Sequence, residues 1–185
     1  MEFREYGQKL GQFVVDALPK LTAVKSGNVD LQAVTFTGIA NKNKIDMLQQ
    51  AREVLNAYNA GGTTAAEPLL VQYGFSSVWE AEAIIDRSAA GETIDMTLFA
   101  LSIGEISFVF APYEMFAPTG MYIKENSPFD MTFIATCTND AFGYLPTEKA
   151  YAYEAYETYV ARFVPGTAEK VADTYLEMLD KLKKS

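Results

Sequence analysis

Two short segments contain residues whose types and positions could do chemistry. The first is Ala111-Pro112-Tyr113-Glu114, which follows an apolar segment typical of a strand. A carboxylate at the end of a strand often lies in a functional site, where it can act as a general base or bind a metal ion. Glu114 could instead belong to the first turn of a helix, where the helix dipole favours a negative charge. The residues alone leave both interpretations open.

The second segment is the loop of residues 138–147, which contains Asn139, Asp140 and Tyr144. It follows an apolar segment, and ligands usually bind to loops at the carboxyl ends of buried strands. The alternative is ordinary turn chemistry, because Asn, Asp and Gly are favoured in turns for conformational reasons.

The chain of 185 residues contains no histidine and one cysteine, Cys137. Serine, cysteine and metal hydrolases usually need histidine as a base or a ligand. An enzyme complete within this chain would therefore have to use carboxylates, tyrosines, lysines or a cofactor. Cys137 lies in the apolar segment 131–138 and is predicted to be a buried, inert thiol.

Composition indicates a globular chain, with 49% hydrophobic and 21% charged residues. We expect residues 1–185 to form one domain or a large part of one. The net charge of −9 argues against nucleic acid and anionic lipid as partners. No apolar segment is long enough to span a bilayer, and residues 1–20 lack the apolar core of a signal peptide. The bacterial cytoplasm is the default expectation for localisation.

Hydrophobic periodicity predicts an α/β fold, or alternatively α+β, with a mixed β-sheet layered with helices. The near-continuous apolar segment 131–138 is typical of a central strand covered on both faces. The expected helix 3–18, at the amino end of the chain, has no strand before it, which suggests a chain cut from a larger domain. The expected helices are 3–18, 45–58, 64–90 with a break near Gly74, 114–124 and 167–182, and the expected strands are 31–37, 96–101, 106–110 and 131–138.

The order of short motifs resembles the C-terminal part of the neutral/alkaline ceramidase family, most closely a bacterial branch. The resemblance covers the motif-bearing region 98–166 and is weaker before it. The motifs are Leu101-Ser102-Ile103-Gly104-Glu105-Ile106, Pro112-Tyr113-Glu114, Ser127-Pro128-Phe129, Asn139-Asp140, Gly143-Tyr144-Leu145-Pro146-Thr147, Tyr156-Glu157 and Arg162-Phe163-Val164-Pro165-Gly166.

The resemblance implies a zinc-dependent amide hydrolase in which a zinc-bound water attacks an N-acyl sphingoid base. It implies two histidine ligands from an N-terminal half, a glutamate ligand at Glu114 and a tyrosine ligand at the position of Ala141. Alanine cannot bind zinc, so Tyr144 would have to replace that ligand. One carboxylate cannot hold a catalytic zinc, which takes three protein ligands. The chain is therefore expected to carry a partial metal site and to bind no zinc by itself.

The resemblance also assigns residues to a cleft. Glu114 and Tyr144 are the candidate catalytic residues, and the candidate substrate-binding residues are Asn139, Asp140, Tyr113 and Tyr156. We expect Glu114, Asn139, Asp140 and Tyr144 to surround one cleft.

Three hypotheses follow. The chain could be the C-terminal part of a ceramidase-like hydrolase, inactive alone, or a free-standing ligand-binding or assembly module of the same fold. It could also be an enzyme of different chemistry that uses Glu114, Asp140 and Tyr144 as acid, base and orienting group. A homo-oligomer or a missing N-terminal half is the expected partner, because a part of a larger domain exposes apolar surface.

Overall fold

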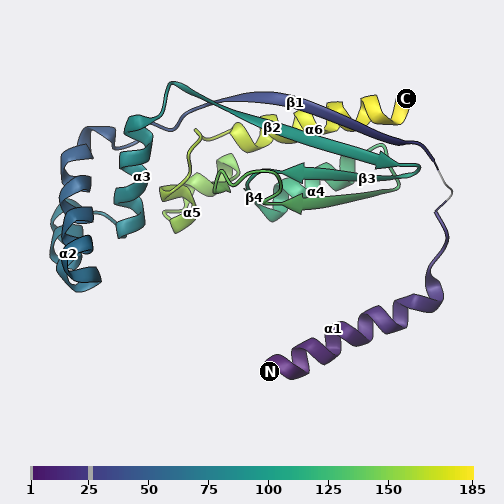
Figure 1. Ribbon diagram of the computed structural model, residues 1–185, viewed down its shortest axis with the longest axis horizontal. Helices are drawn as coiled ribbons and strands as arrows, with labels where there is room; N and C mark the ends of the chain where they lie inside the picture. The colour runs from purple at the N-terminus through teal and green to yellow at the C-terminus, as the bar shows by residue number, and fades with distance from the viewer. Residues whose placement is uncertain (1, 25–26) are drawn as a thin grey trace.

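The computed structural model describes residues 2–24 and 27–185. Its centre is a four-stranded sheet in the order β1-β2-β3-β5, with helices on one side and a helix pair beyond one end (Figure 1). This mixed sheet layered with helices confirms the predicted α/β fold class. The strands are β1 (Val29–Ile39), β2 (Thr93–Ile103), β3 (Ile106–Ala111) and β5 (Met131–Thr136), and a separate two-stranded sheet joins β4 (Glu114–Met115) to β6 (Tyr144–Leu145).

The helices are interspersed among these strands along the chain. The α-helices are α1 (Phe3–Ala17), α2 (Leu48–Tyr73), α3 (Val78–Ala89), α4 (Ala117–Asn126), α5 (Tyr156–Tyr159) and α6 (Thr167–Lys184). Three short 3-10 helices are η1 (Leu18–Lys20), η2 (Ile45–Met47) and η3 (Glu148–Ala152).

Pairing within the sheet is antiparallel for β1–β2 and β2–β3 and parallel for β3–β5. A hairpin turn at 103–105 joins β2 to β3, and Gly104 has a φ of 57° that favours glycine. Helix α4 connects the parallel strands β3 and β5, as such a pair requires a crossover.

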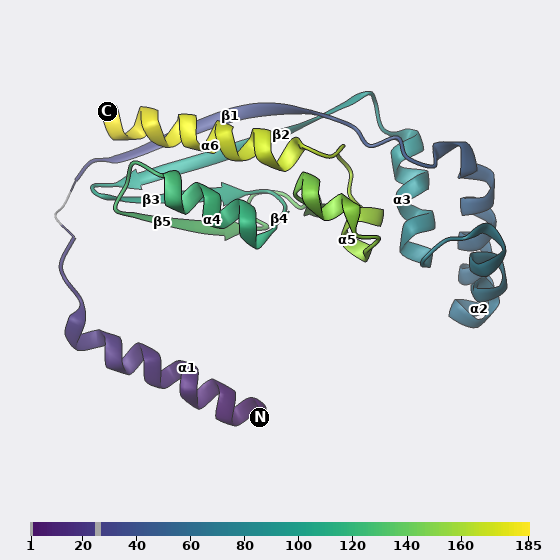
Figure 2. The same cartoon turned by 180° about the vertical axis from the view of Figure 1, so that it is seen from behind.

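The main core lies between one face of the sheet and the helices α4 and α6. Figure 2 shows these two helices on the same side of the sheet. Helix α6 contributes its predicted apolar face, including Tyr175 and Leu179, which are both 0% exposed. The facing strand residues include Leu98 and Val109, also 0% exposed. Apolar burial of this size is the main stabilising term for the sheet and its helices.

A second, separate core holds α2 and α3 together as a helix pair. Ala51, Val54 and Ile84 are fully buried in it. Gly61 and Gly62 form a kink inside α2, because both glycines have non-helical backbone angles while the helix continues to Tyr73. Ser77 caps α3, since its hydroxyl accepts a 3.2 Å hydrogen bond from the Glu80 amide.

Three predictions from sequence are wrong. Glu114 lies in strand β4, and the helix begins only at Ala117. Strand β5 is an edge strand with one open face, because Met131 and Phe133 are 51% and 44% exposed. Cys137 is exposed and has a φ of 53°, because the chain turns sharply directly after β5.

Helix α1 has no place in either core. Every described residue from Glu2 to Val24 is exposed, and Figure 1 shows α1 apart from the sheet. Among residues 2–24 and 27–185, no helix is both long and apolar enough to cross a membrane.

Candidate functional site

The two-residue strands β4 and β6 bring the two candidate catalytic residues together. In their parallel pairing, Glu114 lies directly opposite Tyr144. The Glu114 amide donates a 2.8 Å hydrogen bond to the Gly143 carbonyl, and Leu145, 1% exposed, anchors β6 in the main core. Gly143 has a φ of 74°, which a residue with a side chain rarely adopts. The local backbone therefore fixes a carboxylate beside a phenol.

The side chains of this pair interact. The pKa of Tyr144 is raised, first by the neighbouring Glu114 side chain, and further by burial and by the nearby negative charges. The Tyr144 ring packs edge-on against the ring of Tyr156, with 5.9 Å between centroids. Tyr144 thus keeps its proton well into the alkaline range and is oriented by two neighbours.

These residues line a cavity of about 610 Å³. This volume is within the range of small-molecule sites, roughly 300–1,000 Å³. The cavity wall is mixed, with three acidic and two basic side chains among apolar and aromatic ones. The lining residues are Asn41, Trp79, Glu82, Ala83, Asp86, Arg87, Ala89, Ala90, Ile94, Glu114, Gly143, Tyr144, Tyr156, Val160 and Arg162.

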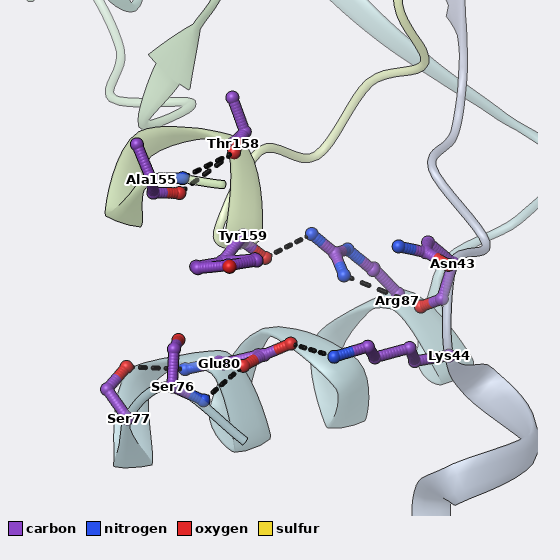
Figure 3. A network of polar contacts seen from close by, with 9 residues as sticks. All are labelled: Asn43, Lys44, Ser76, Ser77, Glu80, Arg87, Ala155, Thr158 and Tyr159. Atoms are coloured by element: carbon purple, nitrogen blue, oxygen red, sulfur yellow. Dashed lines mark hydrogen bonds and ion pairs between the residues drawn. The ribbon is translucent and has the colours of Figure 1, made fainter. Parts of the chain in front are cut away.

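Arg87 joins the helix pair to the rest of the molecule at this cavity. The residue is 4% exposed and donates hydrogen bonds to the backbone carbonyls of Tyr159, Ala161 (2.9 Å) and Asn43 (3.4 Å). Figure 3 shows the guanidinium between α5 and the chain before η2. Burial lowers the pKa of Arg87, opposed by the charges of Tyr151 and Glu80. Arg87 therefore holds α3 to α5 and to the chain before η2.

A half-buried ion pair between Lys44 and Glu80 lies beside Arg87 (Figure 3). The Lys44 ammonium lies 2.5 Å from the Glu80 carboxylate, which is 2% exposed and also accepts a 2.6 Å bond from the Ser76 amide. Burial by itself raises the pKa of Glu80, but the bonds from Lys44 and Ser76 outweigh it and lower that pKa. Glu80 thus stays ionised and fixes the start of α3 against the loop before η2.

The predicted single cleft is divided in two. Glu114, Tyr144 and Tyr156 line the large cavity, whereas Asn139 and Asp140 line a second cavity of about 310 Å³ with Asp95. The loop after β5 turns away from the first cavity because Asn139 has a φ of 68°, and the Asp140 carboxylate accepts a 2.7 Å bond from the Ala141 amide. The triad of Glu114, Asp140 and Tyr144 is therefore not assembled in one cavity.

Tyr113 lies in the main core and not in the cleft. It is 1% exposed and lines neither cavity, and burial raises its pKa. Strand alternation explains this placement, because neighbouring residues point to opposite sides and Glu114 points outward.

The residues around Glu114 do not fit a catalytic zinc ion. Within residues 2–24 and 27–185, no three His, Cys, Asp or Glu side chains are grouped closely enough to hold a metal. Glu114 has Tyr144 beside it, and Ala141 offers no ligand atom. A catalytic zinc takes three protein ligands and keeps a fourth position open.

No family model matches the sequence, and no curated protein sequence matches it. Two solved structures are similar to it. One is a ceramidase complexed with C2, at 18% identity and a TM-score of 0.46, over 49% of this chain and 15% of the ceramidase chain. The other is the neutral ceramidase from Pseudomonas aeruginosa, at 20% identity and a TM-score of 0.45, with the same coverage. The matched region spans about 15% of these ceramidase chains.

Sequence reasoning missed the contribution of α3 to the cavity, which includes Trp79 and Arg87. A signal was present, because Glu80, Ile84 and Arg87 follow helical spacing on the buried side of α3. Charged residues at buried helix positions are rare unless they are paired or hydrogen-bonded. Their partners come from distant segments, which the helix pattern does not reveal.

Proposed function

We propose that this chain is the C-terminal part of a neutral/alkaline ceramidase-like amide hydrolase. In this proposal it contributes Glu114, Tyr144 and one wall of the substrate cleft, and it is not catalytically competent alone. One observation carries the proposal: the β4–β6 pairing sets Glu114 beside Tyr144 in a cavity of about 610 Å³. The motif resemblance, which names Glu114 as a site residue, supports it.

The chemistry of the pair suits an amide. A carboxylate accepts hydrogen bonds, and a phenol that keeps its proton donates them. Side by side, they complement the N–H and C=O groups of an amide. The apolar side chains of Trp79, Ile94 and Val160 in the same cavity offer contacts for an aliphatic chain. An N-acylated amphiphile therefore matches the wall that this chain provides.

Hydrolysis needs more than this pair supplies. General-base catalysis by one carboxylate contributes a factor of about 100–10,000. Enzymes usually accelerate reactions by about a million-fold or more. In the proposal, zinc and its histidine ligands belong to a separate N-terminal half, and this chain alone binds zinc weakly or not at all.

Binding and turnover test the proposal separately. Short-chain N-acyl sphingosine should bind the purified chain, and Glu114→Gln or Tyr144→Phe should weaken binding about tenfold, as for one lost hydrogen bond to a charged or buried partner. Tyr153→Phe is the matched control, because Tyr153 is 65% exposed and lies outside the cavity. Equal binding by all four proteins would contradict the assignment of the cleft.

Turnover should be absent for the chain alone, with or without added zinc. Release of the sphingoid base that Glu114→Ala abolishes would show a complete enzyme and would refute the proposal. Activity that appears only on mixing with an N-terminal half, and one-to-one zinc binding only in that mixture, would support it.

A free-standing ligand-binding module is the second candidate. It is favoured by the origin of the cavity, whose walls come from α3, β2, β4, β6 and α5 of this one chain. Ligand binding by the isolated chain that does not change on adding an N-terminal half would favour this module.

A further inference from the structure

One face of the four-stranded sheet is open and apolar. At the end of the sheet near the β2–β3 hairpin, all four strands place apolar side chains on this face. Phe108 stacks on Phe110 and Phe133, with ring centroids 6.2 and 5.1 Å apart. Val29 and Leu31 are 65% and 58% exposed. The open patch consists of Val29, Leu31, Ala33, Phe99, Leu101, Ile103, Ile106, Phe108, Phe110, Met131, Phe133 and Ala135.

Helix α1 has an apolar side that no other described element covers. Phe3, Tyr6, Leu10, Phe13 and Val14 recur at helical spacing on one side of α1. Their exposed fractions lie between 59% and 81%. An amphipathic helix gains most of its stability in proteins from packing its apolar face, so α1 needs a partner.

In the described structure α1 does not rest on the open patch of its own chain, and Figure 1 shows it apart from the sheet. The Gly104 amide donates a 3.3 Å hydrogen bond to the Asn28 carbonyl, which continues the line of β1 along the hairpin turn. Gly27 then lies against that turn, since a Cβ on Gly27 would be 2.3 Å from the Gly104 Cα.

We propose that two copies of this chain exchange their α1 helices, each helix packing its apolar side on the open patch of the other copy. The dimer is twofold symmetric, with two identical helix-on-sheet contacts. This interface goes beyond the proposed function and does not depend on it.

The available area is sufficient for a stable dimer. A buried aromatic side chain removes about 150–250 Å² from solvent, so Phe3, Tyr6 and Phe13 alone contribute about 500 Å² per helix. The sheet buries a similar area, and two contacts therefore bury about 2,000 Å². Stable interfaces bury about 1,200–2,000 Å² in total.

Charge favours a second copy over a membrane surface. The segment 2–20 carries three acidic side chains (Glu2, Glu5, Asp16) and three basic ones (Arg4, Lys9, Lys20), whereas the whole chain carries a net charge of −9. A neutral helix can approach this acidic body without repulsion. Helices that bind anionic membranes are instead rich in Lys and Arg on the polar side.

Sedimentation velocity over a range of concentrations, with reductant to keep exposed Cys137 from forming disulfides, tests the proposal. The wild-type protein should be a dimer at micromolar concentrations. Leu10→Glu with Phe13→Glu should raise the dimer dissociation constant about 100-fold or more, as for two interface anchors. Gln8→Glu with Gln12→Glu adds the same charge on the polar side of α1 and should leave the dimer intact.

Complementation separates helix exchange from other contacts. Leu31→Glu places a charge in the open patch and should abolish the dimer. Thr35→Glu places the same charge on the same face of β1 but outside the patch, and should leave the dimer intact. Mixing Leu31→Glu with the Leu10→Glu/Phe13→Glu variant should restore a heterodimer, because one intact helix meets one intact sheet.

Three results would overturn the proposal. They are a wild-type monomer at all concentrations, a dimer that survives Leu10→Glu/Phe13→Glu, or a solution monomer that binds phosphatidylglycerol vesicles through α1. The first would place α1 on its own sheet, and the second would indicate direct packing of two sheets. None of these results bears on ligand binding, because Phe99, the patch residue nearest the cavity on β2, is five residues from Ile94, or about 17 Å.

Discussion

Replacing Arg87 with methionine should separate the helix pair α2–α3 from the sheet. Methionine keeps much of the apolar stem of arginine but has no donor for the backbone carbonyls of Tyr159, Ala161 and Asn43. The helix pair has its own core, so it should not unfold for lack of apolar contacts. What it loses is the hydrogen bonding that attaches it to α5 and to the loop before η2.

The magnitude follows from the hydrogen bonds. A bond from a charged donor contributes about 1.5–3 kcal/mol. The bond to Ala161 is buried and 2.9 Å long and the bond to Tyr159 is partly buried, whereas the 3.4 Å bond to Asn43 contributes little. The Arg87 Nε is buried without a partner among the described residues, which offsets part of the gain. We expect Arg87→Met to cost about 3–4 kcal/mol of unfolding free energy.

Urea unfolding followed by two signals measures this effect. Trp79 is the only tryptophan of the chain and lies on α3, so its fluorescence reports the helix pair. Far-ultraviolet circular dichroism reports the whole chain. In Arg87→Met the fluorescence transition should move to lower urea than the dichroism transition, whereas the two should nearly coincide in the wild type.

Arg162→Met is the matched control for this experiment. Arg162 lines the same cavity, but its side chain is 48% exposed and lies 3.8 Å from Asp86, itself 59% exposed. Such surface pairs contribute less than about 1 kcal/mol. If Arg87→Met destabilised the protein no more than Arg162→Met, Arg87 would not be the attachment of the helix pair.

Three further predictions concern other groups. The pKa of Glu80 is lowered in the folded state, so its stabilising contribution should be complete above the unfolded pKa of about 4.5 and lost as pH falls through the folded pKa. Glu80→Gln should therefore reduce the loss of unfolding free energy at acid pH, which urea denaturation at several pH values measures. Glu114→Gln should lower the pKa of the Tyr144 phenol, which ultraviolet titration of the wild type and the variant will show, and an unchanged titration would contradict the effect of Glu114 on Tyr144. Leu179→Ala should cost about 2–5 kcal/mol in urea unfolding, because Leu179 is 0% exposed in the main core.

Local sequence patterns were sufficient for most elements of the fold. The apolar side of α6 and the hairpin at Gly104 depend on neighbouring residues only, and the structure contains both. The error at β5 has a different origin. Apolar residues on both sides of a strand indicate two covered faces, but at β5 the second side is the open patch of Met131 and Phe133. A pattern records which surfaces are apolar and does not record what covers them.

The candidate site was predicted in part for the same reason. Glu114 and Tyr144 come together through a two-residue strand pair that no periodicity could indicate, and only the motif resemblance joined them. Asn139 and Asp140 were assigned to the same cleft because they are close to Tyr144 in sequence. A left-handed backbone at Asn139 sends them to a second cavity, and residue type alone does not fix such a turn.

The cavity lies where the two separately packed parts of the molecule meet, so its shape depends on their attachment. Trp79, Glu82 and Arg87 come from the helix pair, whereas Glu114 and Tyr144 come from the sheet side. Arg87→Met should therefore abolish ligand binding while the sheet stays folded, because one wall moves away. Glu114→Gln should weaken binding while stability stays within about 0.5 kcal/mol of the wild type, since Glu114 is an exposed surface residue. This contrast distinguishes a residue that holds the cavity together from one that touches the ligand.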